Sequence, residues 1–128
     1  MEQIVDANII LRFLVRDVES QYKIAAKWFK DAEKGKRKFI IKPLVIGEVV
    51  FVLESFYKNK REDVASAMET FLSQKWLIVE ERSVLLSLWS WYRKNLHFVD
   101  SFLLSWAKEN KAGIASFDKQ LLNSLPSD

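Results

Sequence analysis

The chain contains no cysteine, and this absence removes several structural and chemical options. Disulfide bonds and thiolate zinc sites are both excluded, so carboxylates and the lone His97 are the strongest metal ligands that remain. A protein without disulfides suits a reducing compartment, and we expect this one in the cytoplasm.

Glycine, proline and long apolar runs are also scarce. Three glycines and two prolines among 128 residues leave little scope for long irregular loops. No apolar run reaches the roughly 18 residues that a membrane span requires. The first six residues, Met1 to Asp6, carry acids at once and lack the basic-then-apolar pattern of a secretory signal. The sequence therefore predicts one soluble domain over residues 1–128, large enough to enclose a single core.

Charge of one sign is only slightly in excess, because 20 basic residues face 17 acidic ones and the net charge is +3. If four of the acids bind a cation, the remaining residues carry a net charge that is four units more positive than the +3 of the whole chain. Such a surface around an acidic pocket suits a polyanion such as nucleic acid. A small basic excess can equally serve solubility alone.

Hydrophobic periodicity predicts alternating strands and helices. We expect strands at residues 3–5, 39–41, 76–79 and 114–115. Helices are expected after Asp6, then over 20–33, 44–57, 61–74, 83–96 and 100–110, with a last turn after Asp118. Strands separated by helices are best joined by right-handed crossovers into a parallel sheet covered on both faces. The predicted fold is a three-layer α/β/α arrangement around a parallel sheet of four to five strands.

Three aspartates fall where such a sheet binds ligands, beyond the carboxyl ends of its strands. Asp6 follows the first expected strand, Asp118 follows the fourth, and Asp100 opens a helix that leads toward the fourth. Each has a simpler explanation, because aspartate is among the best residues for capping a helix N-terminus.

Glu48 is harder to explain without a ligand. It lies in the run from Leu44 to Leu53, which is otherwise apolar on every side, and a helix that is apolar all round is expected to be buried. A buried carboxylate is costly unless it is paired or binds a metal, and no lysine or arginine lies within one turn of it. Converging carboxylates suit a hard cation such as Mg²⁺ or Mn²⁺. We therefore predict that Asp6, Glu48, Asp100 and Asp118 form one divalent-metal site.

Four segments of the chain resemble the PIN-domain ribonucleases, and within that family the VapC-like toxins of toxin–antitoxin pairs. They are Val5–Leu14, Pro43–Glu48, Phe98–Leu104 and Ala115–Lys119. The likeness covers nearly the whole chain in the expected order, and the four segments together are more specific than any one alone.

The resemblance implies a parallel sheet of 3-2-1-4-5 order, an acidic pocket for one or two Mg²⁺ or Mn²⁺ ions, and hydrolysis of RNA phosphodiester bonds. It places Asp6, Glu48, Asp100 and Asp118 on the four acids of the family, with Asn8 and Ser116 as supporting polar residues. It also implies three partners: an RNA substrate, with tRNA and rRNA as candidates, a cognate antitoxin, and a second copy of the chain in a homodimer. Two features depart from the pattern: His97 stands where many relatives carry an acid, and no convincing fifth strand follows.

Basic and aromatic side chains supply candidates for RNA contact. Arg12, Arg16 and Lys42 flank the expected site, although solvated helix ends are an equally good reading of each. Trp89, Trp91 and Tyr92 could stack on bases, but their spacing favours packing in a core or interface. The apolar segment from Val49 to Tyr57, together with Phe71, is a candidate dimer face.

Two other functions compete with a metal-dependent nuclease. A phosphatase with Asp6 as nucleophile would resemble haloacid-dehalogenase sites, but these carry a second acid where this chain has Asn8, and Glu48 would have no role. A non-catalytic metal-, RNA- or partner-binding module remains the main alternative.

Overall fold

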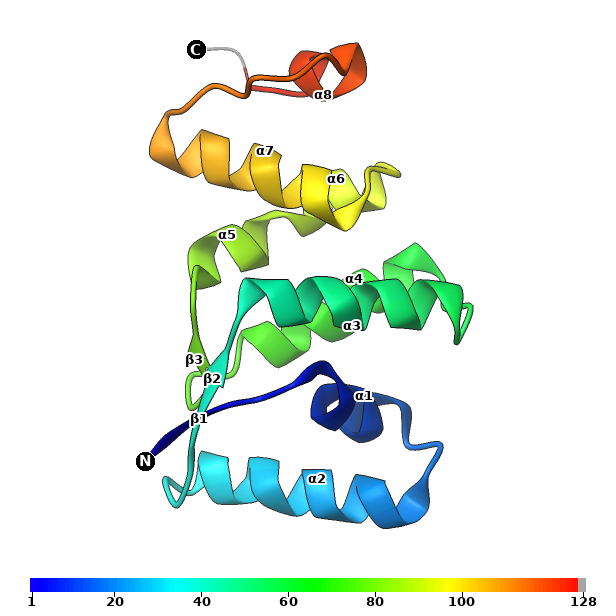
Figure 1. The fold of residues 1–128 in the computed structure, drawn as a ribbon, viewed down its shortest axis with the longest axis vertical. Helices are drawn as coiled ribbons and strands as arrows, with labels where there is room; N and C mark the ends of the chain where they lie inside the picture. Colours follow the sequence, from blue (N-terminus) through cyan, green and yellow to red (C-terminus); the bar gives the residue numbers. More distant parts are fainter. Residues whose placement is uncertain (127–128) are drawn as a thin grey trace. The chain divides into compact units, whose positions relative to one another are not determined.

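The computed structural model describes residues 1–126 (Figure 1). Internal contacts divide the chain into two compact units, one from Met1 to Glu80 and one from Glu81 onward. None of the helices within the described residues is long and apolar enough to cross a membrane.

The first unit contains a parallel sheet of three strands. β1 (Glu2–Ile4), β2 (Lys38–Ile41) and β3 (Ile78–Val79) lie in the order β1-β2-β3, so β2 is central. Gln3 is opposite Phe39, and Ile40 is opposite Ile78. This order agrees with the first three strands of the arrangement expected for the family.

Four helices connect these strands. They are α1 (Ala7–Val15), α2 (Glu19–Glu33), α3 (Pro43–Ser55) and α4 (Arg61–Leu72). α1 packs against both α2 and α3, and α3 packs against α4. Pro43 begins α3, where its missing N–H costs no helical hydrogen bond.

Phe29 is the centre of the first unit's core. It is almost fully buried, and its ring lies 4.7 Å from Phe13, 5.5 Å from Phe39 and 5.7 Å from Phe71, between ring centres. These partners come from α1, β2 and α4, so one side chain of α2 joins three elements. The apolar spacing of Ala25, Phe29 and Ala32 along α2 produces this buried face.

The second unit is helical over its described residues. It contains α5 (Arg82–Ser87), α6 (Trp89–Arg93), α7 (Phe98–Asn110) and α8 (Lys119–Asn123). α7 packs against both α5 and α6. The buried Ser105 hydroxyl donates a 2.9 Å hydrogen bond to the Val84 carbonyl, which ties α7 to α5.

The predicted fold class is confirmed as mixed α/β with a parallel sheet flanked by helices, and three of the expected strands are present. Residues 114–115, expected as a fourth strand, have no strand structure in the described chain. So short a segment, next to Gly113, has little strand preference of its own and depends on a pairing partner.

Several expected helix boundaries also differ. The helix expected over 83–96 is divided at Leu88, where the Trp91 N–H bonds back three residues to the Leu88 carbonyl and tightens the turn. The helix expected to open at Asp100 begins at Phe98 instead.

Candidate functional site

Asp6 and Glu48 belong to helices that leave neighbouring strands at one edge of the sheet. The Val5 N–H donates a 3.1 Å hydrogen bond to the Ile40 carbonyl, which holds the end of β1 against β2. Asp6 comes directly after Val5, and α3 begins two residues after Ile41. Because the strands are parallel, α1 and α3 both start at the carboxyl edge, where ligands collect in sheets of this class.

Two of the candidate acids cap helices. The Asp6 Oδ1 accepts a 3.0 Å hydrogen bond from the Ile9 N–H at the start of α1. The Asp118 Oδ1 accepts a 3.2 Å bond from the Leu121 N–H at the start of α8. The capping role considered for both residues is therefore real. It occupies one oxygen of each carboxylate, and the second oxygen accepts no hydrogen bond from the described residues.

Ser116 supports Asp118 directly. Its hydroxyl oxygen accepts a 2.9 Å hydrogen bond from the Asp118 N–H and so fixes the backbone that carries this acid. Asn8 is exposed in the first turn of α1, two residues after Asp6.

Asp100 lies in the first turn of α7 and does not cap it. His97 occupies the N-cap position, and its exposed side chain makes no capping hydrogen bond. Asp100 is half-buried, and a carboxylate in this turn interacts favourably with the positive end of the helix dipole.

The expected burial of Glu48 is wrong. Its side chain is exposed, on the face of α3 that also presents Leu44 (87 % exposed) and Phe51 (68 % exposed). The buried stripe of α3 consists of Ile46, Val49, Val50 and Leu53. An apolar composition does not require that every face be covered, since folded proteins leave many apolar side chains at the surface. The case for Glu48 therefore rests on its place beside the sheet edge and not on a desolvation penalty.

Each unit carries two of the four acids. Asp6 and Glu48 lie in the first, and Asp100 and Asp118 in the second. Neither unit alone, over residues 1–126, contains a group of three or more histidine or acidic side chains that could hold a metal ion.

The three basic residues considered for RNA contact all have partners inside the chain. Each forms an ion pair with a carboxylate: Arg12 with Asp17 at 2.9 Å, Arg16 with Glu19 at 3.2 Å, and Lys42 with Glu80 at 2.6 Å. These acids reduce the local positive potential.

Packing is confirmed for two of the three aromatic residues considered for base stacking. Trp89 and Tyr92 are fully buried, with ring centres 5.3 Å apart. Trp91 is half-buried, and the Lys108 Nζ lies 5.9 Å from the centre of its ring.

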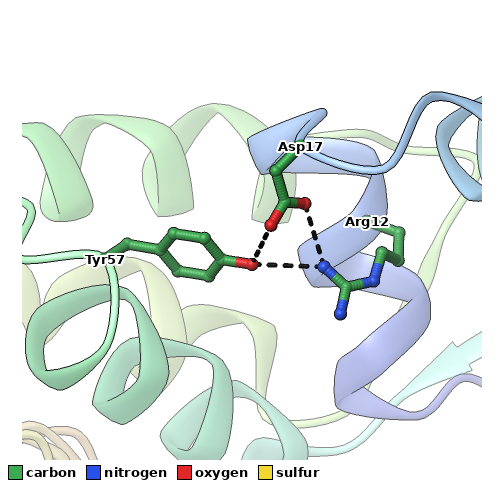
Figure 2. A network of polar contacts seen from close by, with 3 residues as sticks. All are labelled: Arg12, Asp17 and Tyr57. Carbon is green, nitrogen blue, oxygen red and sulfur yellow. Dashed lines mark hydrogen bonds and ion pairs between the residues drawn. The ribbon is translucent and has the colours of Figure 1, made fainter.

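Two features of the first unit were not found from the sequence. One is an apolar groove of about 660 Å³ between α1, α2 and α4, lined by Phe13, Leu14, Phe71 and Trp76 among others. The other is a hydrogen-bonded cluster of Arg12, Asp17 and Tyr57 (Figure 2). Both depend on contacts between helices that are distant in sequence, for which periodicity gives no signal.

A family model for the PIN domain matches residues 4–124 of the chain. The chain belongs to the PIN-domain family. All four acids, together with Asn8 and Ser116, lie within the matched part of this PIN domain.

A curated relative points in the same direction. The PIN domain is 29% identical over 113 residues to a protein named VapC ribonuclease from Aquifex aeolicus (strain VF5). The alignment covers 88% of this chain and 82% of the relative. The expected resemblance to VapC-like ribonucleases is therefore confirmed. No solved structure matches the chain at a significant level.

Proposed function

We propose that this PIN domain is a Mg²⁺- or Mn²⁺-dependent endoribonuclease and the toxin of a toxin–antitoxin pair. The observation that carries the proposal is the arrangement at the sheet edge. Inside a PIN domain, Asp6 and Glu48 lie on helices that leave two hydrogen-bonded parallel strands at their carboxyl ends. The similarity to a protein named VapC ribonuclease supports ribonuclease chemistry for this edge.

The donor set fits a hard divalent cation. Asp6, Glu48, Asp100 and Asp118 offer only carboxylate oxygens, the ligands that Mg²⁺ and Mn²⁺ prefer. Neither Glu48 nor Asp100 forms an ion pair within the described part of its own unit, so neither charge is neutralised there. Four uncompensated carboxylates brought together would repel one another, and a cation removes that conflict.

We assign Asp6, Asp100 and Asp118 to hold the cation, and Glu48 to hold it or to orient the attacking water. When bound, the cation supplies Lewis-acid chemistry, which lowers the pKa of water and stabilises charge on the phosphate. The cap bond from the Ile9 N–H restricts the rotation of Asp6, and Ser116 fixes the backbone at Asp118. We assign Asn8, which is exposed two residues after Asp6, to hydrogen-bond water or phosphate there. Hydrolysis would leave a 5′-phosphate and a 3′-hydroxyl.

We assign RNA contact to basic side chains around this edge, with Arg16 and Lys42 as the first candidates. Both side chains are at least one-third exposed and lie next to helices that carry a candidate acid. On RNA binding, phosphate groups would have to replace Glu19 and Glu80 as the ion-pair partners of these two side chains.

We also propose two protein partners. One is a cognate antitoxin, in keeping with the VapC-like resemblance. The other is a second copy of this chain, through a face that includes the exposed Phe51 and Phe56. The proposed location of the complex is the cytoplasm.

The direct test is RNA cleavage by the purified protein, freed of any antitoxin. Total RNA that includes tRNA is incubated with Mg²⁺ or Mn²⁺, or with a chelator, and Asp6→Asn is the matched variant. We expect cleavage only in wild type with metal, with 5′-phosphate ends on the products. Cleavage that persists in the chelator or in the variant would overturn the proposal. Binding of metal or RNA without cleavage under any condition would favour a non-catalytic module.

A further inference from the structure

Three side chains of the first unit form a closed ring of polar contacts (Figure 2). The Arg12 Nη1 donates to the Asp17 Oδ1 at 2.9 Å and to the Tyr57 hydroxyl oxygen at 3.2 Å. The Tyr57 hydroxyl donates in turn to the Asp17 Oδ2 at 2.7 Å. Every member of this Arg12–Asp17–Tyr57 cluster therefore contacts the other two.

The cluster joins the far ends of α1 and α3. Arg12 lies in the last turn of α1, and Asp17 follows Arg16, whose left-handed backbone (φ 58°) ends that helix. Tyr57 comes two residues after the end of α3. The near ends of the same two helices are held together by the pairing of β1 with β2. α1 and α3 are thus held together at both ends. Asp6 lies at the strand end of α1, and Glu48 lies within α3, between its two ends.

Holding two helices together through the Arg12–Asp17–Tyr57 cluster has a cost in free energy. The Arg12 side chain is only 23 % exposed, and its Nε is buried without a hydrogen-bond partner in the described chain. Burying an unpaired donor costs free energy that the two bonds from Nη1 must offset. Apolar side chains could join the helices without this cost, but they would not fix direction and distance as a closed polar ring does.

We propose that the Arg12–Asp17–Tyr57 cluster positions α1 against α3 and thereby sets the spacing of Asp6 and Glu48 for a divalent cation. This inference rests on the proposed function, and it makes Arg12 a positioning residue instead of an RNA contact.

Helix geometry shows why such a fastening matters. At a rise of 1.5 Å per residue, Glu48 lies about 9 Å and Tyr57 about 22 Å from the strand end of α3, taken as a continuous helix. If α3 pivots there, a displacement of about 1 Å at Tyr57 moves Glu48 by about 0.4 Å. Metal–ligand distances in working sites vary by only about 0.2 Å. A small loosening of the cluster is therefore enough to disturb a pair of ligands.

The test compares Mn²⁺ binding by three variants, measured by the electron paramagnetic resonance signal of free Mn²⁺ in the absence of RNA. Tyr57→Phe removes the hydroxyl that accepts a hydrogen bond from Arg12 and donates one to Asp17. Asp17→Asn weakens the Arg12–Asp17–Tyr57 cluster in a different way, by removing the negative charge that pairs with Arg12. Tyr22→Phe is the matched control, because the Tyr22 ring packs on Phe13 and under Arg16 while its hydroxyl makes no hydrogen bond in the described chain.

We expect Tyr57→Phe and Asp17→Asn to raise the dissociation constant for Mn²⁺ about 3- to 10-fold, below the 10–100-fold typical of groups bonded directly to a ligand. The Mn²⁺ concentration for half-maximal RNA cleavage should rise in parallel, and Tyr22→Phe should change neither value. Partial unfolding raises the apparent dissociation constant only in proportion to the folded fraction that is lost. In variants that circular dichroism shows to be folded at the assay temperature, a purely structural role would therefore not move either value. Unchanged Mn²⁺ affinity in both variants, even with a lower Tm, would overturn the inference. Absence of Mn²⁺ binding by wild type would instead overturn the proposed function itself.

Discussion

The Tyr57 hydroxyl lies 2.7 Å from the Asp17 Oδ2 and so links the segments that follow α3 and α1, forty residues apart in sequence. The hydrogen bond from Tyr57, with the charge of Arg12, holds the pKa of Asp17 below its ordinary value. The same hydrogen bond, with burial, raises the pKa of Tyr57 above its ordinary value.

These pKa directions predict how the cluster's contribution to stability depends on pH. Asp17 has a lowered pKa in the folded state, so its contribution is present above the unfolded value of about 3.9 and is lost as pH falls through the folded pKa. Tyr57 has a raised pKa, so its contribution is present below the unfolded value of about 10 and is lost as pH rises through the folded pKa. The difference in Tm between wild type and Tyr57→Phe should therefore be largest from about pH 5 to 9. A difference that stayed constant down to pH 2 would contradict the cluster's ionic character.

Asp6 allows the capping and metal-binding roles to be separated. Asparagine caps a helix about as well as aspartate, whereas alanine loses about 1 kcal/mol of stability. Asp6→Asn should therefore unfold at nearly the same urea concentration as wild type but lose RNA cleavage. Asp6→Ala should lose both. Equal destabilisation by the two substitutions would show that the carboxylate charge itself stabilises the fold, and would contradict the separation of the two roles.

Glu48 should tolerate loss of its charge without loss of stability. Because its side chain is exposed, Glu48→Gln is expected to change the free energy of unfolding by no more than about 0.5 kcal/mol. Metal-dependent cleavage should nevertheless fall sharply. Urea unfolding and a cleavage assay on the same preparation measure the two effects. A strongly stabilised Glu48→Gln protein would point to an unpaired, buried carboxylate after all.

Phe29 should be among the most sensitive core positions of the first unit. Phe29→Ala leaves a cavity among Phe13, Phe39 and Phe71, and the expected loss is about 3–5 kcal/mol. Phe51→Ala is the matched control, because Phe51 is 68 % exposed and its loss should cost about 0.5 kcal/mol or less. Urea unfolding followed by circular dichroism compares them. Similar losses for the two variants would contradict the assigned core.

Local pattern was enough to predict most of the secondary structure. Period-3.6 spacing identified α2 and α4, and the aspartates before α1 and α8 marked their starts correctly. These signals lie within a few residues of one another, so the sequence alone contains them.

Features that depend on distant partners were not predictable in this way. The exposure of Glu48 depends on which face of α3 is covered, and apolar residues on all sides of that helix concealed the answer. Residues 114–115 have no strand structure, because so short a segment depends on a pairing partner. The ring of Arg12, Asp17 and Tyr57 required the packing of α1 on α3 to be known.

The central proposal is that the carboxylates of Asp6, Glu48, Asp100 and Asp118 hold a divalent cation. It is tested most directly by Mn²⁺ titration of wild type and of Asp6→Asn, Glu48→Gln, Asp100→Asn and Asp118→Asn, each first shown to be folded. We expect all four substitutions to weaken Mn²⁺ binding, each by about 10-fold or more. Wild-type affinity in both Asp100→Asn and Asp118→Asn would contradict a site that uses all four carboxylates.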